Sequence, residues 1–434
     1  MRFLSILLAA AVVACTPTSN QVVEAPTEIP LPSITVTEGF TATVFHPGLG
    51  AARHIAVRDN GDVYVAREYR IERKMFGQAA AWGALIALRD EDGDGVAEQV
   101  ESFGPTDAGD EVRIHDGYLY FSSDQVVYRM ALDDNLVPQT VAEPLAGGFP
   151  MTASHGSKTL AFDGAGNFYV NSGTPVNACE TKRMSRASPG IDPCPYLERS
   201  GGVWKFEDDK LHQDQERDGE RYITGTRNIV AMAWNPWADK LYFVMHGRDA
   251  IGMLWPDFYS KQDNADLPAE EFHVAEAGDN FGWPYTYVDP RSNKRMLGPE
   301  YGGDGKIEAQ SRNGEQYKDP LVAFPAHWAP NDLLFHSGTN LPARYEQGAF
   351  IVFHGSWNRM PFVQGGFKVV FVPMRDGKVT GDWNVFAEHF DGAQPVKSPA
   401  QAAYRPTGLA EGPDGALYIT EDKHGRVWKI TPNK

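Results

Sequence analysis

Residues 225–234 read Gly225-Thr226-Arg227-Asn228-Ile229-Val230-Ala231-Met232-Ala233-Trp234, a cation and an amide followed directly by an apolar run. A short unbroken apolar run of this kind is typical of a buried strand. Five other places in the chain repeat the run, and four of those also carry a His or Arg near its start. If the repeats close into a ring, these polar groups meet at one point, where we expect chemistry to occur.

Each repeat consists of an apolar strand, a turn rich in Gly, Asp and Asn, and a second strand with an aromatic residue. In four copies an Ala of the first strand lies 8, 8, 9 and 8 positions before a Tyr of the second, which is β-hairpin spacing. Weaker copies run from Val112 to Tyr120 and from Leu333 to Ala349. The four Ala–Tyr pairs are Ala56 and Tyr64, Ala161 and Tyr169, Ala233 and Tyr242, and Ala410 and Tyr418.

The six starts, near residues 56, 112, 161, 233, 334 and 410, have the spacing of four-stranded blades with loops inserted on one face. We therefore predict an all-β fold, a six-bladed β-propeller. A two-sheet sandwich is the competing fold, but it would need an unusually large number of strands. Two strand-like segments near the start, Ile34-Thr35-Val36 and Ala42-Thr43-Val44-Phe45, are expected to complete the last blade and close the ring.

Composition supports a protein of strands and turns, with 43 Gly, 30 Pro and 12% aromatic residues. The formal net charge of −17 at pH 7 repels nucleic acid and anionic lipid, so neither is expected as a partner. The charge says little about a small substrate, because a local basic pocket can lie inside an acidic shell.

The start of the chain is expected to direct the protein to its compartment. Residues 1–14 have the character of a signal peptide, because an apolar run too short to span a bilayer follows Arg2. Val12-Val13-Ala14-Cys15 resembles the lipobox of bacterial lipoproteins, in which Cys15 becomes the lipidated first residue. An ordinary secretory signal cleaved nearby is the alternative.

Residues 15–34 are rich in Pro, Ser and Thr and are expected to form a flexible tether to the propeller domain, residues 35–434. Thr16 after the Cys matches the bacterial sorting pattern for the outer membrane. We therefore expect a periplasmic lipoprotein of a Gram-negative bacterium that touches the membrane only through its lipid anchor.

Two further cysteines, Cys179 and Cys194, lie fifteen positions apart across a loop that contains Pro and Gly. In an oxidising compartment this arrangement favours a disulfide. The chain-entropy estimate for such a loop is about 3 kcal/mol. Two free buried thiols are the alternative.

Polar residues at the starts of the repeats are the candidate site residues. The innermost strand of a propeller blade runs along the central channel, so the residues that enter it lie around the channel mouth. Each residue alone is as well explained as a structural His or a surface Arg. Three cations and three imidazoles at one mouth, however, indicate an anionic, oxygen-rich ligand. The residues are Arg53, His54, His155, Arg227, Asn228, His327 and Arg405.

A possible second metal signal lies outside the mouth. Asp90-Glu91-Asp92-Gly93-Asp94-Gly95, with Glu101 at the twelfth position, satisfies the EF-hand loop pattern. Its flanks, Ala84–Leu88 and Gln99–Phe103, are expected to be strands, whereas an EF-hand needs helices on both sides. Asp90, Asp92 and Asp94 either bind calcium in a hairpin loop or form an exposed turn that binds nothing.

Several longer motifs follow one another between about Gly39 and Lys429. They are Arg227-Asn228-Ile229-Val230, Ala233-Trp234-Asn235-Pro236, His246-Gly247-Arg248-Asp249, Asn280-Phe281-Gly282-Trp283-Pro284, His327-Trp328-Ala329-Pro330, His354-Gly355-Ser356-Trp357-Asn358-Arg359 and Arg405-Pro406. With these motifs the chain resembles the soluble, propeller-fold sugar dehydrogenases that depend on pyrroloquinoline quinone (PQQ). It is most similar to their sorbosone dehydrogenase-like branch.

The resemblance implies that PQQ and Ca²⁺ are bound at the channel mouth and that an aldose or aldosone is oxidised there. His155, in Ser154-His155-Gly156-Ser157, matches the general base that takes the proton of the anomeric hydroxyl while hydride passes to the quinone. Arg227 would stabilise the reduced cofactor. The electrons would pass to an external acceptor, a cytochrome or a quinone.

The same resemblance assigns the remaining residues. Asn228 and Arg405 would hold PQQ, and Arg53, His54 and His327 would lie along its edge. The backbone carbonyls of Gly247 and Arg248 match the calcium ligands, through which the ion would act as a Lewis acid.

Three positions depart from the glucose-oxidising relatives. Thr174 stands where those relatives have an Asp that orients the base, and Thr407 replaces the second Arg of their Arg-x-Arg motif. Their fifth-blade Lys is replaced by the segment His354–Arg359, in which Arg359 is the substitute cation. These differences leave the identity of the sugar open.

Two other functions are compatible with the sequence. A metal-dependent lactone hydrolase on a similar propeller would need several carboxylates around the axis, and the mouth positions carry mainly cations and imidazoles. A non-catalytic binding propeller descended from the enzyme is the other, because the Asp partner of His155 is missing.

Overall fold

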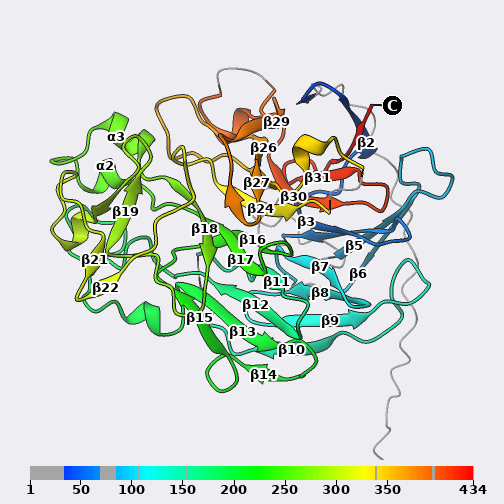
Figure 1. Ribbon diagram of the computed structural model, residues 1–434, viewed down its shortest axis with the longest axis horizontal. Helices are drawn as coiled ribbons and strands as arrows, with labels where there is room; N and C mark the ends of the chain where they lie inside the picture. Colours follow the sequence, from blue (N-terminus) through cyan, green and yellow to red (C-terminus); the bar gives the residue numbers. More distant parts are fainter. Residues whose placement is uncertain are drawn as a thin grey trace, which may run out of the picture.

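The computed structural model describes residues 34–68, 85–105, 108–152, 154–337, 340–392 and 396–433. Six sheets of four or five strands form the blades of a propeller, and their innermost strands gather near the centre of Figure 1. The predicted all-β, six-bladed fold is confirmed. The predicted signal peptide, the lipidation site Cys15 and nearly all of the tether lie outside the described residues. No helix in the described part of the chain has the length and apolar character that a membrane crossing requires.

In blades 1 to 3 the chain runs from the innermost strand outwards. Blade 1 contains β3 (Ala52–Val57), β4 (Val63–Arg67), β5 (Leu85–Arg89) and β6 (Gln99–Phe103). Blade 2 contains β7 (Val112–His115), β8 (Tyr118–Ser122), β9 (Val127–Ala131) and β10 (Glu143–Gly147), with β14 (Gln213–Asp214) added at its edge. Blade 3 contains β11 (Leu160–Phe162), β12 (Asn167–Ser172), β13 (Gly202–Glu207) and β15 (Glu220–Thr224).

Blades 4 to 6 follow the same plan. Blade 4 contains β16 (Ile229–Asn235), β17 (Lys240–Met245), β18 (Glu270–Ala275) and β23 (Val322–Phe324). Blade 5 contains β24 (Pro330–Phe335), β25 (Ala349–Phe353), β26 (Lys368–Val372), β29 (Asn384–Glu388) and β1 (Thr35–Val36). Blade 6 contains β30 (Pro406–Glu411), β31 (Leu417–Glu421), β32 (Val427–Pro432) and β2 (Phe40–His46).

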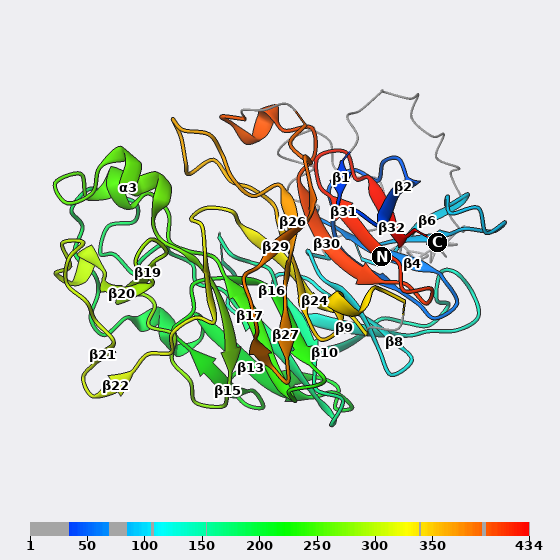
Figure 2. The ribbon, with the colours of Figure 1, turned by 45° about the horizontal axis from the view of Figure 1, so that its top comes forward.

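Short elements interrupt this plan in the loops. A large insertion in blade 4 carries most of them and lies at one side of the propeller in both views (Figures 1 and 2). It contains α2 (Ile251–Leu254), α3 (Lys261–Asp266), β19 (Thr286–Asp289), β20 (Lys294–Leu297), a 3₁₀ turn at Pro299–Tyr301, β21 (Ser311–Arg312) and β22 (Glu315–Gln316). The others are β27 (Met374–Arg375), β28 (Lys378–Val379) and 3₁₀ turns at Pro195–Glu198, Ala343–Tyr345 and Pro399–Gln401.

The inner two strands of each blade form an antiparallel hairpin with the predicted register. In all four Ala–Tyr pairs named above, the Ala lies directly opposite its Tyr. A hairpin has its turn at one end, so the residues before its first strand and after its second strand emerge together at the other end. This geometry places two segments of every blade at the same mouth.

Strand β2 closes the ring, as predicted. It pairs with β32 from the other end of the chain, with Val44 opposite Trp428, and the two lie side by side in Figure 2. The expectation for the earlier segment was wrong, because β1 pairs with β29 of blade 5, with Thr35 opposite Glu388. The turn through Gly39, in the left-handed region at φ 92°, separates the two strands and sends them to different blades.

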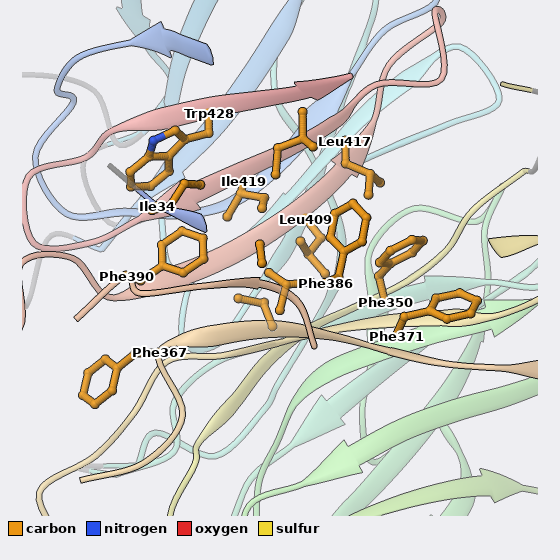
Figure 3. Close-up of a cluster of buried hydrophobic side chains, with 14 of the residues drawn as sticks. Ile34, Phe350, Phe367, Phe371, Phe386, Phe390, Leu409, Leu417, Ile419 and Trp428 are labelled. Atoms are coloured by element: carbon orange, nitrogen blue, oxygen red, sulfur yellow. The ribbon is translucent and has the colours of Figure 1, made fainter. Parts of the chain in front are cut away.

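A buried apolar cluster fills the space between blades 5 and 6 (Figure 3). It packs Phe350, Phe371 and Phe386 of blade 5 against Leu409 and Trp428 of blade 6, among others. Phe40 of the closing strand joins this cluster, with its ring centroid 5.1 Å from that of Phe386 and 5.5 Å from that of Tyr345.

Substitution Phe40→Ala should therefore destabilise the whole propeller. The lost burial and the cavity left between the blades predict a decrease of about 3–5 kcal/mol in the free energy of unfolding, measured by urea denaturation. Thr41→Ala is the matched control, because Thr41 is exposed on the same strand. Equal unfolding midpoints for the two variants would contradict this account of ring closure.

Candidate active site

His155 is held as a neutral imidazole with one free nitrogen. It precedes β11, and its Nδ1 donates a hydrogen bond of 2.7 Å to the carbonyl of Thr174, which follows β12. Because a carbonyl oxygen only accepts, Nδ1 carries the hydrogen and Nε2 keeps its lone pair. Burial, followed by the charge of Arg227, lowers the pKa of His155 to about 3. Thr174 thus supplies a backbone carbonyl that fixes the tautomer.

Gly173 allows this loop to approach blade 4 closely. A Cβ at Gly173 would lie 2.7 Å from the Cβ of His155 and 2.9 Å from Oδ1 of Asn228. Only glycine leaves room for both neighbours. His155 itself is in the left-handed region at φ 55°, a strained conformation that is common at functional sites.

Arg227 is fixed by groups that follow the second strand of its own blade. Its Nη1 donates to the carbonyl of Gly247 at 3.0 Å, and its Nη2 to Oδ2 of Asp249 at 2.7 Å. The other carboxylate oxygen of Asp249 accepts from Asn358, and its backbone makes hydrogen bonds of 2.9 and 2.8 Å with the side chain of Asn177. Burial would raise the pKa of Asp249, but Arg227 and two imidazoles outweigh it and lower the pKa.

The loop proposed to bind calcium is tied to its surroundings by two buried carboxylates. Glu270 accepts from the backbone N–H groups of Gly247, at 2.8 Å, and Ala329, at 3.0 Å, and so joins two mouth loops. Burial raises the pKa of Glu270 to about 7. The guanidinium of Arg248 pairs with Glu300 and is directed into the blade 4 insertion. The carbonyl of Gly247, a predicted calcium ligand, here accepts from Arg227.

A second polar network joins blades 5, 6 and 1. Oδ2 of Asp422 accepts from Nη1 of Arg53 at 3.1 Å and from Nε2 of His354 at 2.9 Å. Nη2 of Arg405 donates to Nδ1 of His354 at 3.0 Å and to the carbonyl of Gly355 at 2.7 Å. Burial, with the charge of Arg405, lowers the pKa of His354 to about 4. Arg53 and Arg405 therefore meet through one imidazole and one carboxylate.

The two predicted edge histidines are engaged by protein groups. Both ring nitrogens of His54 contact protein atoms, and so does one ring nitrogen of His327. His54 is almost fully buried, with Nδ1 3.0 Å from Oε2 of Glu111 and Nε2 2.6 Å from the carbonyl of Asn331. Burial would lower the pKa of His54, but Glu111 outweighs it and raises the pKa. Nε2 of His327 lies 2.9 Å from the carbonyl of Asn264.

Arg359, the predicted substitute cation, serves as a brace for the segment around α3. Its Nη2 pairs with Oδ1 of Asp266 at 3.1 Å. Its remaining donors contact the backbone carbonyls of Ala265, Ala326 and Val363. The donors of Arg359 are therefore engaged by protein groups. At the mouth, the structure brings His155, Arg227 and Asn228 together.

Sequence reasoning missed several groups that follow a second strand. Apart from Gly247, Arg248 and Arg359, it considered only residues near the start of each first strand, although the hairpin register itself indicates that both segments share the mouth. His246 is one of them, with Nε2 2.6 Å from the carbonyl of Pro330. The mouth therefore carries carboxylates as well as cations and imidazoles, because Arg53 lies beside Asp422 and Arg227 beside Asp249. The groups without an assigned role were His246, Asp249, His354 and Asp422.

Several buried polar atoms at this mouth have no hydrogen-bond partner among the residues described. They include Oδ1 of Asn228 and the Nε atoms of Arg53, Arg227 and Arg405. Buried polar groups in folded proteins are almost always satisfied, so these atoms are candidates to contact a ligand or ordered water. The guanidinium donors suit the carboxylates and carbonyls of PQQ, whereas the amide oxygen of Asn228 accepts from a donor.

The acidic loop forms a hairpin turn between β5 and β6, flanked by the expected strands. Ligand atoms of Asp90, Asp92 and Asp94 lie within 4.8 Å of one another and of Glu98, not of Glu101. Glu101 lies on β6 and accepts from Gln99. The Asp side chains accept backbone N–H groups of their own turn, so they also stabilise it without an ion.

The predicted disulfide is confirmed. Cys179 and Cys194 are bonded across the fifteen-residue separation. Asn177, two residues before Cys179, makes hydrogen bonds with both the backbone N–H and the backbone carbonyl of Asp249. The disulfide therefore supports the position of the Arg227 partner as well as the loop.

The geometry of the mouth can now be set beside known proteins. Residues 34–433 match the TrAA12-like family. The chain belongs to this family. TrAA12-like proteins are PQQ-dependent oxidoreductases, so the predicted membership of the PQQ sugar dehydrogenases is confirmed.

Two curated relatives have established names. "Aldose sugar dehydrogenase YliI" of Escherichia coli (strain K12) is 21% identical over 298 residues, which cover 65% of this chain and 61% of that protein. "Pyrroloquinoline quinone-dependent pyranose dehydrogenase" of Coprinopsis cinerea is 31% identical over 174 residues, which cover 34% of this chain and 22% of that protein. The chain thus spans less than two-thirds of the length of either relative.

Among solved structures, an AA12-family enzyme of Trichoderma reesei resembles this chain with a TM-score of 0.73 at 17% identity. The alignment covers 94% of this chain and 99% of that one. At this identity the likeness establishes the shared propeller fold.

Loss of the disulfide should destabilise the TrAA12-like domain. Replacing both cysteines, Cys179→Ser with Cys194→Ser, should lower the free energy of unfolding by about 3 kcal/mol, as expected for a loop of this length. Urea denaturation of the variant and of the wild type, each with and without reductant, measures the effect. Only the wild type should respond to reductant, and a wild type that does not respond would contradict a structural role.

Stability should also decrease on acidification through His155 and His354, whereas Glu270, with its raised pKa, acts in the opposite sense. His155 and His354 have folded-state pKa values of about 3 and about 4, below the ordinary 6.5. The unfolded chain binds protons at these positions that the folded chain does not, so stability is lost as pH falls from about 6.5 towards 4. We expect a lower melting temperature at about pH 5 than at about pH 7. His354→Asn should reduce this difference, and a melting temperature independent of pH would refute the neutral state of both rings.

Proposed function

We propose that this protein oxidises an aldose or aldosone at its anomeric carbon with PQQ and Ca²⁺ bound at the channel mouth, and that an external cytochrome or quinone accepts the electrons. Family membership supports the cofactor, and the names of the E. coli and Coprinopsis cinerea relatives support a sugar substrate. The observation that carries the proposal is the hydrogen bond from Nδ1 of His155 to Thr174, because it leaves Nε2 free to accept a proton.

Three residues would hold the cofactor. Asn228 and Arg405 contribute the unpaired amide oxygen and Nε donor described above, and Arg227 contributes a second unpaired Nε. Asp249 and the Gly247 carbonyl fix the guanidinium of Arg227, so its charge is in place before the reaction. The backbone carbonyls of Gly247 and Arg248 are the groups available for Ca²⁺. When bound, PQQ supplies the two-electron acceptor and Ca²⁺ a Lewis acid for it.

His155 acts as the general base in this proposal. Its Nε2 takes the proton of the anomeric hydroxyl, and the Thr174 carbonyl keeps the ring oriented as the imidazolium forms. A pKa of about 3 makes His155 a weak base, and Arg227 is one cause of that value. An anion bound beside Arg227 would offset its charge and raise the pKa of His155 towards neutrality.

We also propose that Cys15 is lipidated and that the protein is anchored to the outer membrane on its periplasmic side in a Gram-negative bacterium. This rests on residues 1–34 alone. The disulfide supports an oxidising compartment.

The proposal is tested by reconstituting the apo-protein with PQQ and Ca²⁺ and offering a sugar panel with an artificial electron dye. His155→Gln should abolish dye reduction, a loss of at least about a hundredfold for a general base, while PQQ binding followed by its absorbance remains. An active variant would refute the role of His155. Bound PQQ without oxidation of any sugar would indicate a binding propeller, and no PQQ binding would remove the proposal altogether.

A further inference from the structure

An exposed loop beside His155 concentrates positive charge in an otherwise acidic protein. We define the basic loop as residues 180–188, which contain Lys182, Arg183 and Arg186. All three side chains are exposed, and none forms a salt bridge with a carboxylate of the described residues. In a chain of net charge −17, three unmatched cations in five positions form a distinct local field.

Arg183 connects the basic loop to the proposed base. Its Nη2 donates a hydrogen bond of 2.7 Å to the hydroxyl of Ser154, the residue directly before His155. This bond uses one of the five N–H donors of the guanidinium. The guanidinium of Arg183, which keeps spare donors, therefore contacts the residue next to His155, the proposed base.

The structure holds the basic loop in place. Glu180 is buried, and its two carboxylate oxygens accept the backbone N–H groups of Ala178 and Met184, each at 2.9 Å. The N–H of Ala187 donates to the carbonyl of Leu254 in α2, also at 2.9 Å. The disulfide closes the segment that contains the loop. Because the backbone of the basic loop is already fixed, it loses little further conformational entropy when a ligand binds.

Two arginines at the mouth are already paired with carboxylates, whereas the cations of the basic loop are paired with none in the described part of the chain. Arg227 is paired with Asp249, and Arg53 with Asp422. His155 is neutral for the reasons given above. Arg405 is proposed above to hold the cofactor, so an anionic group on the sugar would meet its complementary charge at the basic loop.

We propose that the substrate is a sugar acid, whose carboxylate is bound by Arg183 and the basic loop while its anomeric hydroxyl lies at His155. This inference rests on the proposed function and specifies its substrate class. The chemistry is that of the same oxidation. The C1–H and hydroxyl O–H bonds break, the C1–O bond becomes the lactone carbonyl, and the two electrons pass to PQQ and then to the external acceptor.

The test compares sugars that differ only in the charge at C6, namely glucose with glucuronate and galactose with galacturonate, at saturating PQQ and Ca²⁺. The wild type should show the higher kcat/KM with the acids, and the preference should shrink in high salt. Arg183→Gln should lower kcat/KM for the acids about tenfold and change the neutral sugars less than about twofold, as expected from loss of one charge-assisted hydrogen bond.

Two variants serve as controls. Arg183→Lys keeps the charge and should retain most of the preference. Lys378→Gln removes an exposed cation on β28, which lies in the connection from β26 to β29. Because β25 ends beside the mouth at His354 and β26 runs antiparallel to it, that connection is at the opposite end of the blade. Lys378→Gln should leave the preference unchanged.

Oxidation of neutral sugars without a preference for acids would overturn the inference and leave the proposed function standing. The decrease of kcat/KM in Arg183→Gln could instead depend on the charge of the dye and not on that of the sugar. This result would also overturn the inference, because the basic loop would then act on the electron acceptor.

A second measurement does not depend on turnover. Glucarate carries the carboxylate but has no anomeric carbon, and calorimetry measures its binding to the PQQ-loaded protein. Binding should be about tenfold weaker in Arg183→Gln than in the wild type. If no sugar is oxidised, the proposed function fails separately, and equal binding of glucarate by the two proteins would overturn the inference.

Discussion

The antiparallel pairing of the two inner strands of each blade is the constraint on which the site depends. The pairing puts the turn at one end of the hairpin, so the segments before the first strand and after the second strand must leave it together at the other end. Within single blades this joins His155 with Thr174, Arg227 with Asp249, and Arg53 with Glu68. Closing six such hairpins into a ring then brings the pairs to one mouth.

Charge pairing within the mouth determines what the site can do. Buried salt bridges contribute little net stability, because desolvation offsets most of the attraction between the charges. They do restrict geometry, and Asp249 and Asp422 each hold a guanidinium in one position. The cost is that these cations are already balanced before any ligand binds. Asn228 and the Nε groups of Arg227 and Arg405 provide the remaining polar atoms.

The carbonyl of Thr174 performs part of the role that a carboxylate partner of His155 would have. It selects the tautomer of His155, as a carboxylate would, but adds no negative charge. Burial and Arg227 therefore lower the pKa of His155, and Asp249 and the hydrogen bond to Thr174 oppose them only in part. The basicity of the site consequently depends on the charge of what is bound beside it, whereas an Asp would make it a fixed property of the protein.

Local patterns predicted the fold because hairpin register is a local property. The spacing of Ala56 and Tyr64 and its three counterparts is set by strand length and turn chemistry, both visible over ten residues. His54 shows where this reasoning ends. It lies near the start of an inner strand, in β3, yet its partners Glu111 and Asn331 lie 57 and 277 positions away. Arg359 likewise occupies a family motif but braces the segment around α3.

The sequence by itself determined the number of blades, the register of their hairpins, the closing strand and the pairing of Cys179 with Cys194. Only the tertiary structure decided the tautomer of His155, the partners of Arg227 and the blade that β1 joins, which is blade 5. The reason is physical. Strand period and turn residues act between near neighbours, whereas a proton position or a shifted pKa depends on burial and on groups that meet only after the ring has closed.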